Sequence, residues 1–209
     1  MAIESQDTTF EIESGAGGAI TITGITEGSY TKVLAVAHDL AIGDVVAFAA
    51  VVGMTEINGL TAMVVAVESA DLFWVPIDSS LFTAYDSAGT ATPATYTVVG
   101  EVVGIDRADD EAAEIQTTHL TSTRHEYLMG LPGSLKATLS VNFIPDNTGQ
   151  LACRAAQIAR TLIGFRLTYS DGGVRTFDGY VTSLSETLGV DGKADGSITI
   201  RGSGADALT

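Results

Sequence analysis

LKATLSVNFIPDN, residues 135–147, carries the clearest structural signal in this chain. Residues 135–143 alternate between apolar and polar side chains, as in a strand that is buried on one face only. Pro145 cannot donate a backbone hydrogen bond to a neighbouring strand, so we expect the strand to end before it. The apolar face consists of Leu135, Ala137, Leu139, Val141 and Phe143.

A helix is predicted directly after this strand. Asn147 is a favourable N-cap, and Gln150, three residues later, can complete a capping box. Gly164 is a suitable residue to end the helix. Apolar residues recur at helical spacing and predict its buried face: Leu151, Ala155, Ile158 and Leu162.

Further strand patterns complete the C-terminal half. Residues 165–169 alternate, Asp171-Gly172-Gly173 forms a turn, and residues 174–184 predict the return strand. The alternation slips at Asp178-Gly179, which predicts a β-bulge there. Residues 194–201 alternate again and predict a last strand.

The N-terminal half has a different rhythm. TTFEIES, residues 8–14, predicts one short strand. Short β-rich runs follow at 33–37, 45–50, 61–68 and 72–77, and turn-forming residues separate them. This spacing predicts a small antiparallel barrel or sandwich. The stretch around Pro93 is expected to be a linker that leads out of it.

Residues 106–133 form a long polar segment with strong β-propensity. Its Thr-rich part favours an extended chain, and a loop of this length is usually functional or a projecting arm. Tyr127, Leu128, Met129 and Leu131 place an apolar cluster at its end. Two interpretations stay open: an ordinary edge hairpin with an exposed tip, or an arm that contacts another molecule.

The charge balance argues against a nucleic-acid-binding protein. The chain has 209 residues and a net charge of −16, with 26 acidic and 10 basic residues, whereas tight binding to phosphates needs clustered Lys and Arg. No Lys or Arg occurs between Lys32 and Arg107. This acidity fits either a solvated surface that resists aggregation or a surface that DNA passes without adhering.

Reactive residues are scarce, so we expect no enzyme, no cofactor and no metal site. His38, His119 and His125 lack the spacing of zinc ligands, and Cys153 is the single cysteine. No apolar run is long enough for a membrane-spanning helix. MAIESQDTT lacks the basic start and apolar run of a secretory leader, so we expect synthesis in the cytoplasm.

Three segments together resemble the tail tube proteins of tailed bacteriophages, most closely those of long non-contractile tails. They are EVVGIDRADDEAAEIQTTHLTSTRHEYLMGLPG (101–133), LKATLSVNFIPDN (135–147) and RTFDGYVTSLSETLGVDGKADGSITIRGSG (175–204). The resemblance implies a mainly β fold: a tail-tube-like β-sandwich or barrel with one α-helix and a long projecting arm. The pattern of the N-terminal half adds a second small antiparallel β-barrel domain.

The resemblance also implies a domain organisation and a function. Residues 1–19 and 97–209 would form a discontinuous tail tube domain, and residues 20–96 an inserted barrel on the tube exterior. The subunits would form stacked, commonly hexameric rings around a hollow conduit for genome ejection, in a virion assembled in the bacterial cytoplasm. The implied residues of the inter-subunit arm are Thr118, Leu120, Arg124, Tyr127 and Leu131.

The partners implied by the family are further copies of the chain, a tape measure protein, a tail terminator and a distal tail protein. DNA would pass through the lumen without specific binding. An alternative is a capsid decoration or baseplate-hub protein that binds host surface glycan. For that alternative, Phe73, Trp74 and Phe82 are the candidate sugar-binding aromatics, although aromatics inside apolar runs are more often core residues.

Overall fold

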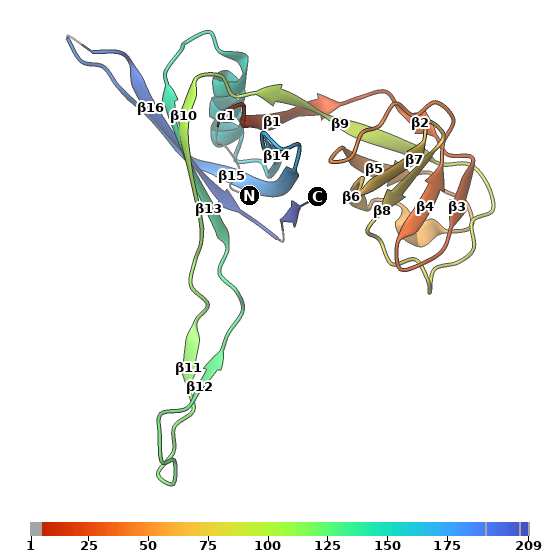
Figure 1. Ribbon diagram of the computed structural model, residues 1–209, viewed down its shortest axis with the longest axis horizontal. Helices are drawn as coiled ribbons and strands as arrows, with labels where there is room; N and C mark the ends of the chain where they lie inside the picture. Colours follow the sequence, from red (N-terminus) through yellow and green to blue (C-terminus); the bar gives the residue numbers. More distant parts are fainter. Residues whose placement is uncertain (1–5, 191, 205, 209) are drawn as a thin grey trace. The chain divides into compact units, whose positions relative to one another are not determined.

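The computed structural model describes residues 6–190, 192–204 and 206–208 (Figure 1), and within them the protein is mainly β, with α1 (Thr148–Ala159) as its α-helix. It divides into two compact units. Unit 1 comprises residues 1–98, 164–176 and 206–209, and unit 2 comprises residues 99–163 and 177–205. The predicted division into a discontinuous tail tube domain (1–19 and 97–209) and an inserted domain (20–96) stays a prediction.

In unit 1, the N-terminal strand β1 (Thr9–Ala16) lies between β14 (Ile163–Thr168) and β9 (Thr90–Val98). Phe10 and Ile12 alternate with acidic residues along β1 and are fully buried. Phe10 packs against Phe165, with 5.7 Å between the ring centroids. This alternation is the pattern of a half-buried strand, and it confirms the strand predicted for residues 8–14.

Arg166 on β14 connects three parts of unit 1. Its Nε lies 2.6 Å from Glu11 Oε2 and its Nη1 3.2 Å from Asp44 Oδ1. The guanidinium also stacks over the Tyr96 ring, 4.4 Å from the centroid. Burial by itself would lower the pKa of Arg166, but the two carboxylates outweigh it and raise that pKa. The side chain is therefore a charged connection between β14, β1 and Asp44, the residue before β5 (Val45–Ala49).

The stretch around Pro93 is a strand, so the expectation of a linker there is wrong. β9 pairs with β1 at its C-terminal end and with β5 (Val45–Ala49) at its N-terminal end. Pro93 lies opposite Val46, and its carbonyl accepts a hydrogen bond from Gly17 N at 2.7 Å. Thr, Tyr and Val residues on either side favour extended backbone, and this outweighs the single missing donor.

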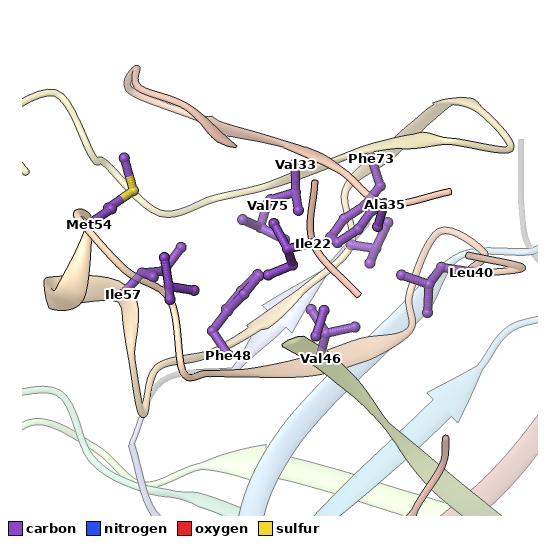
Figure 2. Close-up of a cluster of buried hydrophobic side chains, with 13 residues drawn as sticks. Ile22, Val33, Ala35, Leu40, Val46, Phe48, Met54, Ile57, Phe73 and Val75 are labelled. Carbon is purple, nitrogen blue, oxygen red and sulfur yellow. The ribbon is translucent and has the colours of Figure 1, made fainter. Parts of the chain in front are cut away.

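Two small sheets enclose a core in the rest of unit 1 (Figure 2). One sheet consists of β9, β5, β2 (Ile20–Thr21) and β6 (Thr61–Met63). The other has the order β3 (Gly24–Thr26), β4 (Thr31–Leu34), β8 (Leu72–Val75) and β7 (Ala66–Ser69). Within the described residues these pairings close no ring, so the block is a pair of open sheets rather than a closed barrel.

The buried side chains of this core come from both sheets and from the 3-10 turn η1 (Thr55–Ile57). Phe48 of β5 and Phe73 of β8 are its largest members. The cluster consists of Ile22, Val33, Ala35, Leu40, Val46, Phe48, Val51, Met54, Ile57, Val64, Phe73, Val75 and Ala91. A block of short strands thus has its own apolar interior, as the sequence rhythm predicts.

Unit 2 is built on an antiparallel sheet with the order β10 (Val102–Asp109), β13 (Leu135–Asn142), β16 (Asp195–Gly202) and β15 (Val174–Thr187). β15 begins in unit 1, where β17 (Ala207–Leu208) pairs with its first residues. The predicted alternation of β13 is confirmed, since Leu135, Ala137, Leu139 and Val141 are buried.

The bulge in β15 lies between Val181 and Ser183, not at Asp178-Gly179 as predicted. The two positions differ because Gly179 is a regular ladder residue facing Gly202. A Cβ there would come within 2.8 Å of the Arg201 carbonyl oxygen, so the glycine serves close strand packing.

The helix α1 (Thr148–Ala159) has the predicted N-cap: Asn147 Oδ1 accepts a hydrogen bond from Gln150 N at 3.0 Å. Gln150 does not complete the capping box. Its buried side chain instead accepts from Ile144 N at 3.0 Å and donates to the carbonyls of Gly100 and Asn142 at 3.0 and 2.9 Å. The helix is thereby fastened to one end of the β10–β13 pair, where β10 begins and β13 ends.

The predicted buried face of α1 is wrong. Leu151, Ala155, Ile158 and the following Leu162 are exposed, whereas Gly149, Gln150, Cys153 and Ala156 are buried. Small side chains allow the helix to approach the sheet closely, so apolar size did not decide which face is covered. The helix also ends before Gly164, at Arg160, which takes left-handed backbone angles of φ 55° and ψ 38°.

Residues 110–134, which we call the arm, continue the β10–β13 pair as a long hairpin. Asp109 faces Leu135 at its base, and further along β11 (Glu114–Gln116) pairs with β12 (Tyr127–Met129). Figure 1 shows the two strands continuing as a narrow ribbon away from the sheet of unit 2. A Cβ at Gly133 would overlap the Asp110 carbonyl, so this close approach at the base of the arm requires glycine.

Candidate assembly surfaces

One face of the sheet in unit 2 is lined by hydroxyl side chains. Cross-strand register places Thr138, Thr199 and Ser183 in one row and Ser140, Ser197 and Ser185 in the next. These side chains are exposed or half-buried. The residues between them, such as Leu139 and Ile198, are buried on the opposite face. Asp106 of β10 lies opposite Thr138 and is exposed on the same face, so the face is polar, with this single carboxylate in its two middle rows.

The charges that border this face are largely paired. Arg201 lies opposite Lys136 in the register and forms an ion pair with Asp110. Asp195 pairs with Lys193 at 3.3 Å. The acidic excess of the chain lies mainly in residues 1–98, where Lys32 is the single basic side chain. The sheet face is thus close to neutral, in contrast to the chain as a whole.

The sheet of unit 2 ends in an unpaired strand. Among the described residues, β10 pairs with β13 and has no strand on its other side. Val103, at the bulge between Val102 and Gly104, is 62 % exposed. An open edge with an exposed apolar residue can template pairing with another chain.

The five predicted arm residues are all exposed. Tyr127 lies on β12, while Leu131 follows it and is 88 % exposed. Thr118 has a local role: its hydroxyl accepts a hydrogen bond from Glu126 N at 3.0 Å and closes the end of the hairpin. Leu120 and Arg124 lie in the tip between β11 and β12. The structure therefore places all five on one hairpin, and no contact within unit 2 buries them.

The exposed stripe of α1, defined as Leu151, Ala155 and Ile158 with Leu162 just beyond the helix end, is a surface that sequence reasoning assigned to the core. Ile158 is 74 % exposed, and Leu151 and Leu162 are each 48 % exposed. Apolar side chains gathered on one helix face and left in water mark a contact surface more often than chance.

Sequence reasoning missed the hydroxyl rows. A signal for the rows exists in the sequence, because Ser and Thr recur at alternate positions in residues 183–187 and 197–199. The apolar cluster of the arm was identified, but not that Met129 and Tyr127 share one face of β12, which the two-residue period of a strand implies. The triple hydrogen bonding of Gln150 has no sequence signal beyond its place in the first turn.

The residues considered for chemistry have structural roles or lie apart. His38 is buried, with Nε2 3.1 Å from the Ser69 carbonyl and Nδ1 accepting from Leu40 N. Burial raises the pKa of the Cys153 thiol to about 12, which is the opposite of an activated nucleophile. Among the described residues, no three His, Cys, Asp or Glu side chains gather as metal ligands would.

The aromatics considered for glycan binding do not form an open platform. Phe73 is fully buried and Phe82 packs against the same core. Trp74 is half-buried, with its Nε1 3.3 Å from Glu68 Oε2 and Lys32 over its ring. In the described residues, no helix combines the length and apolarity needed to cross a bilayer.

Residues 80–209 match the family model described as "Lambda phage tail tube protein, TTP". The chain belongs to this tail tube protein family. The match covers more than half of the chain, including the sheet of unit 2, the arm and α1. As a tail tube protein, the chain is a structural component of the phage virion, as the resemblance in its C-terminal half predicts.

A second family model, the ubiquitin-activating enzyme E1 FCCH domain, matches residues 27–94. This region is similar to that domain in its own right and overlaps the tail tube match at residues 80–94. No curated relative matches the chain.

Solved structures that resemble the chain include a chain of the virion of a native gene transfer agent particle, with 18 % identity, a TM-score of 0.48, and coverage of 55 % of this chain and 88 % of that one. A chain of the tail of an empty gene transfer agent particle with C6 symmetry has 19 % identity and a TM-score of 0.47, and the match covers 55 % of this chain and 86 % of that one. The SPP1 tail tube has 15 % identity and a TM-score of 0.44, and the match covers 55 % of this chain and 68 % of that one. The family assignment rests on the match over residues 80–209.

Proposed function

We propose that this protein is the major tail tube subunit, and that its copies form stacked hexameric rings around a conduit for genome ejection. The observation that carries the proposal is the open edge of β10 in the sheet of unit 2, one face of which is buried while the other is polar. Joining such sheets edge to edge around a ring removes the exposed edges. A repeated head-to-tail contact produces a ring when its rotation closes.

The hydroxyl face of this sheet is the surface that we assign to the lumen. Thr138, Ser140, Ser197 and Thr199 offer hydrogen bonds but no positive charge to a passing phosphate backbone. Binding of DNA depends on neutralised phosphates and released counterions, so a nearly neutral wall gives little adhesion. The acidic excess of residues 1–98 would repel DNA from the remainder of the subunit.

The arm is proposed to contact neighbouring subunits through Thr118, Leu120, Arg124, Tyr127 and Leu131. Their exposure in the single chain supports this role. The family further implies a tape measure protein, a tail terminator and a distal tail protein as partners, and assembly in the host cytoplasm.

The test is electron microscopy of the purified full chain over a range of concentrations. Rings or tubes of uniform diameter are expected, with assembly initiated above a threshold concentration or by an initiator complex. A species that stays monomeric at millimolar concentration with an initiator present would contradict the proposal.

Residues 20–96 are proposed as an inserted domain on the tube exterior that tube formation does not need. Thr21 pairs with Thr90, so a two-residue turn such as Asn-Gly can join them and remove residues 22–89. The shortened chain is expected to assemble. A folded, soluble product that never assembles would assign the block to the ring interface.

A further inference from the structure

We propose that in the assembled tube the arm of one subunit docks on the exposed stripe of α1 in a second copy. The docking surface of the arm is the face that carries Tyr127 and Met129. This inference rests on the proposed tube function and adds a specific pair of surfaces to it.

The stripe on α1 has the properties of a receptor surface. Leu151 and Ile158 lie seven residues apart, two helical turns along one face. The helix underneath is held rigidly, because Asn147 caps its first turn and Gln150 ties it to Gly100, Ile144 and Asn142. A rigid apolar ridge loses little conformational entropy when a partner covers it.

The arm presents a complementary face. Pairing of Glu114 with Met129 and of Gln116 with Tyr127 places these four side chains on one side of the ribbon. Ile115 and Leu128, paired between them, point to the other side. Tyr127 and Met129 are 53 % and 70 % exposed. Large exposed aromatic and Met side chains are typical anchors of protein contacts.

Charge favours the same pairing. Arg154 flanks the α1 stripe, between Leu151 and Ile158 in the helical sequence, and forms no ion pair within the described residues. Glu114 shares the arm face with Tyr127 and Met129 and is also without an ionic partner there. Each surface therefore combines apolar side chains with one unpaired charge of opposite sign.

The two surfaces belong to different copies. α1 and the arm lie at opposite ends of unit 2 (Figure 1), so the arm does not fold back on its own helix. A contact between two different surfaces of identical chains is heterologous, and its repetition builds an open filament if it does not close into a ring. We therefore assign the contact to stacking of one ring on the next.

The experiment is disulfide trapping between single-cysteine variants of the full chain. Met129→Cys and Ile158→Cys are purified separately, one with a mass tag, mixed, assembled and mildly oxidised. Leu128→Cys is the matched control, since it neighbours Met129 but faces the other side of the arm. The native Cys153 is fully buried, so it gives little background. A disulfide forms only if the two Cα atoms lie within about 7 Å.

The expected result is a mixed dimer from Met129→Cys with Ile158→Cys, in assembled tubes only, and several-fold less from Leu128→Cys. Tubes without this product, or a preference for Leu128→Cys, would overturn the docking and leave the tube function intact. A product between two Ile158→Cys chains would mean that helices meet each other, and would also overturn it. Absence of tubes from the unmodified chain would refute the tube function itself.

Charge reversal gives an independent readout. Arg154→Glu and Glu114→Arg are each expected to raise the concentration needed for assembly by about 2- to 5-fold, the scale of one exposed ion pair. The double variant is expected to recover most of this loss. If the loss in the double variant instead equals the sum of the two single losses, these charges do not meet.

Discussion

Replacement of the buried Gln150 tests how the receptor helix is held. Gln150→Ala removes three side-chain hydrogen bonds, to Ile144 N and to the carbonyls of Gly100 and Asn142. Each bond contributes about 1 kcal/mol net, and a buried group left without a partner costs about as much again. We therefore expect the free energy of unfolding of unit 2 to fall by about 3 to 5 kcal/mol.

The assay is chemical denaturation of the unassembled chain, followed by a probe in unit 2 because two compact units need not unfold together. Gln157→Ala is the matched control: Gln157 lies on the same helix, and its side chain makes no hydrogen bond within the described residues. That variant should change stability by less than about 0.5 kcal/mol. Equal, small losses in both variants would refute the argument that Gln150 fastens α1 to the sheet.

Four further outcomes are expected. Replacing both Tyr127 and Leu131 with Ala should weaken each inter-subunit contact by about 2 to 5 kcal/mol without changing the monomer melting temperature, as assembly assays and calorimetry would show. Val103→Lys should block growth at the β10 edge, seen as loss of tubes from a normally folded chain; unaltered tubes would exclude this edge from the ring contact. Phe48→Ala should destabilise the core of unit 1 by about 3 to 5 kcal/mol in denaturant titration. Cys153 should resist thiol reagents at pH 9, and rapid labelling of the folded chain would contradict its burial. Because burial raises the pKa of its thiol from 9.0 to about 12 in the folded chain, its contribution to stability should be lost as the pH rises between those two values.

The C-terminal strands were predictable because their environment repeats along the sequence. In β13, buried and exposed positions alternate without interruption, so residue type alone identified the strand and its faces. The N-cap Asn147 was equally accessible, since its hydrogen bond to Gln150 N is local. Signals of this kind depend on neighbours in sequence and need no knowledge of the tertiary structure.

The errors arose where tertiary contacts decide. The face of α1 was assigned by apolar size, but the sheet accepts the small Cys153 and Ala156 and leaves Ile158 outside. Pro93 indicated a linker, yet its neighbours pair with strands distant in sequence. The misassigned stripe is itself informative, because a helix that exposes its largest apolar residues is a candidate for contact with another molecule.

The hydroxyl rows illustrate a second limit. Ser183, Ser197 and Thr199 come from two strands, and only the register of β15 against β16 brings them together on one face. The bulge after Val181 shifts that register, so a count along the sequence alone would place part of the row on the wrong side. The candidate conduit face is thus a property of the sheet rather than of any one segment.

The most direct test of the tube assignment is negative-stain electron microscopy of the purified full chain. We predict rings that stack into hollow tubes of uniform diameter once the concentration passes a threshold or an initiator is added. Discrete particles that never elongate, or a chain that remains monomeric under these conditions, would contradict it.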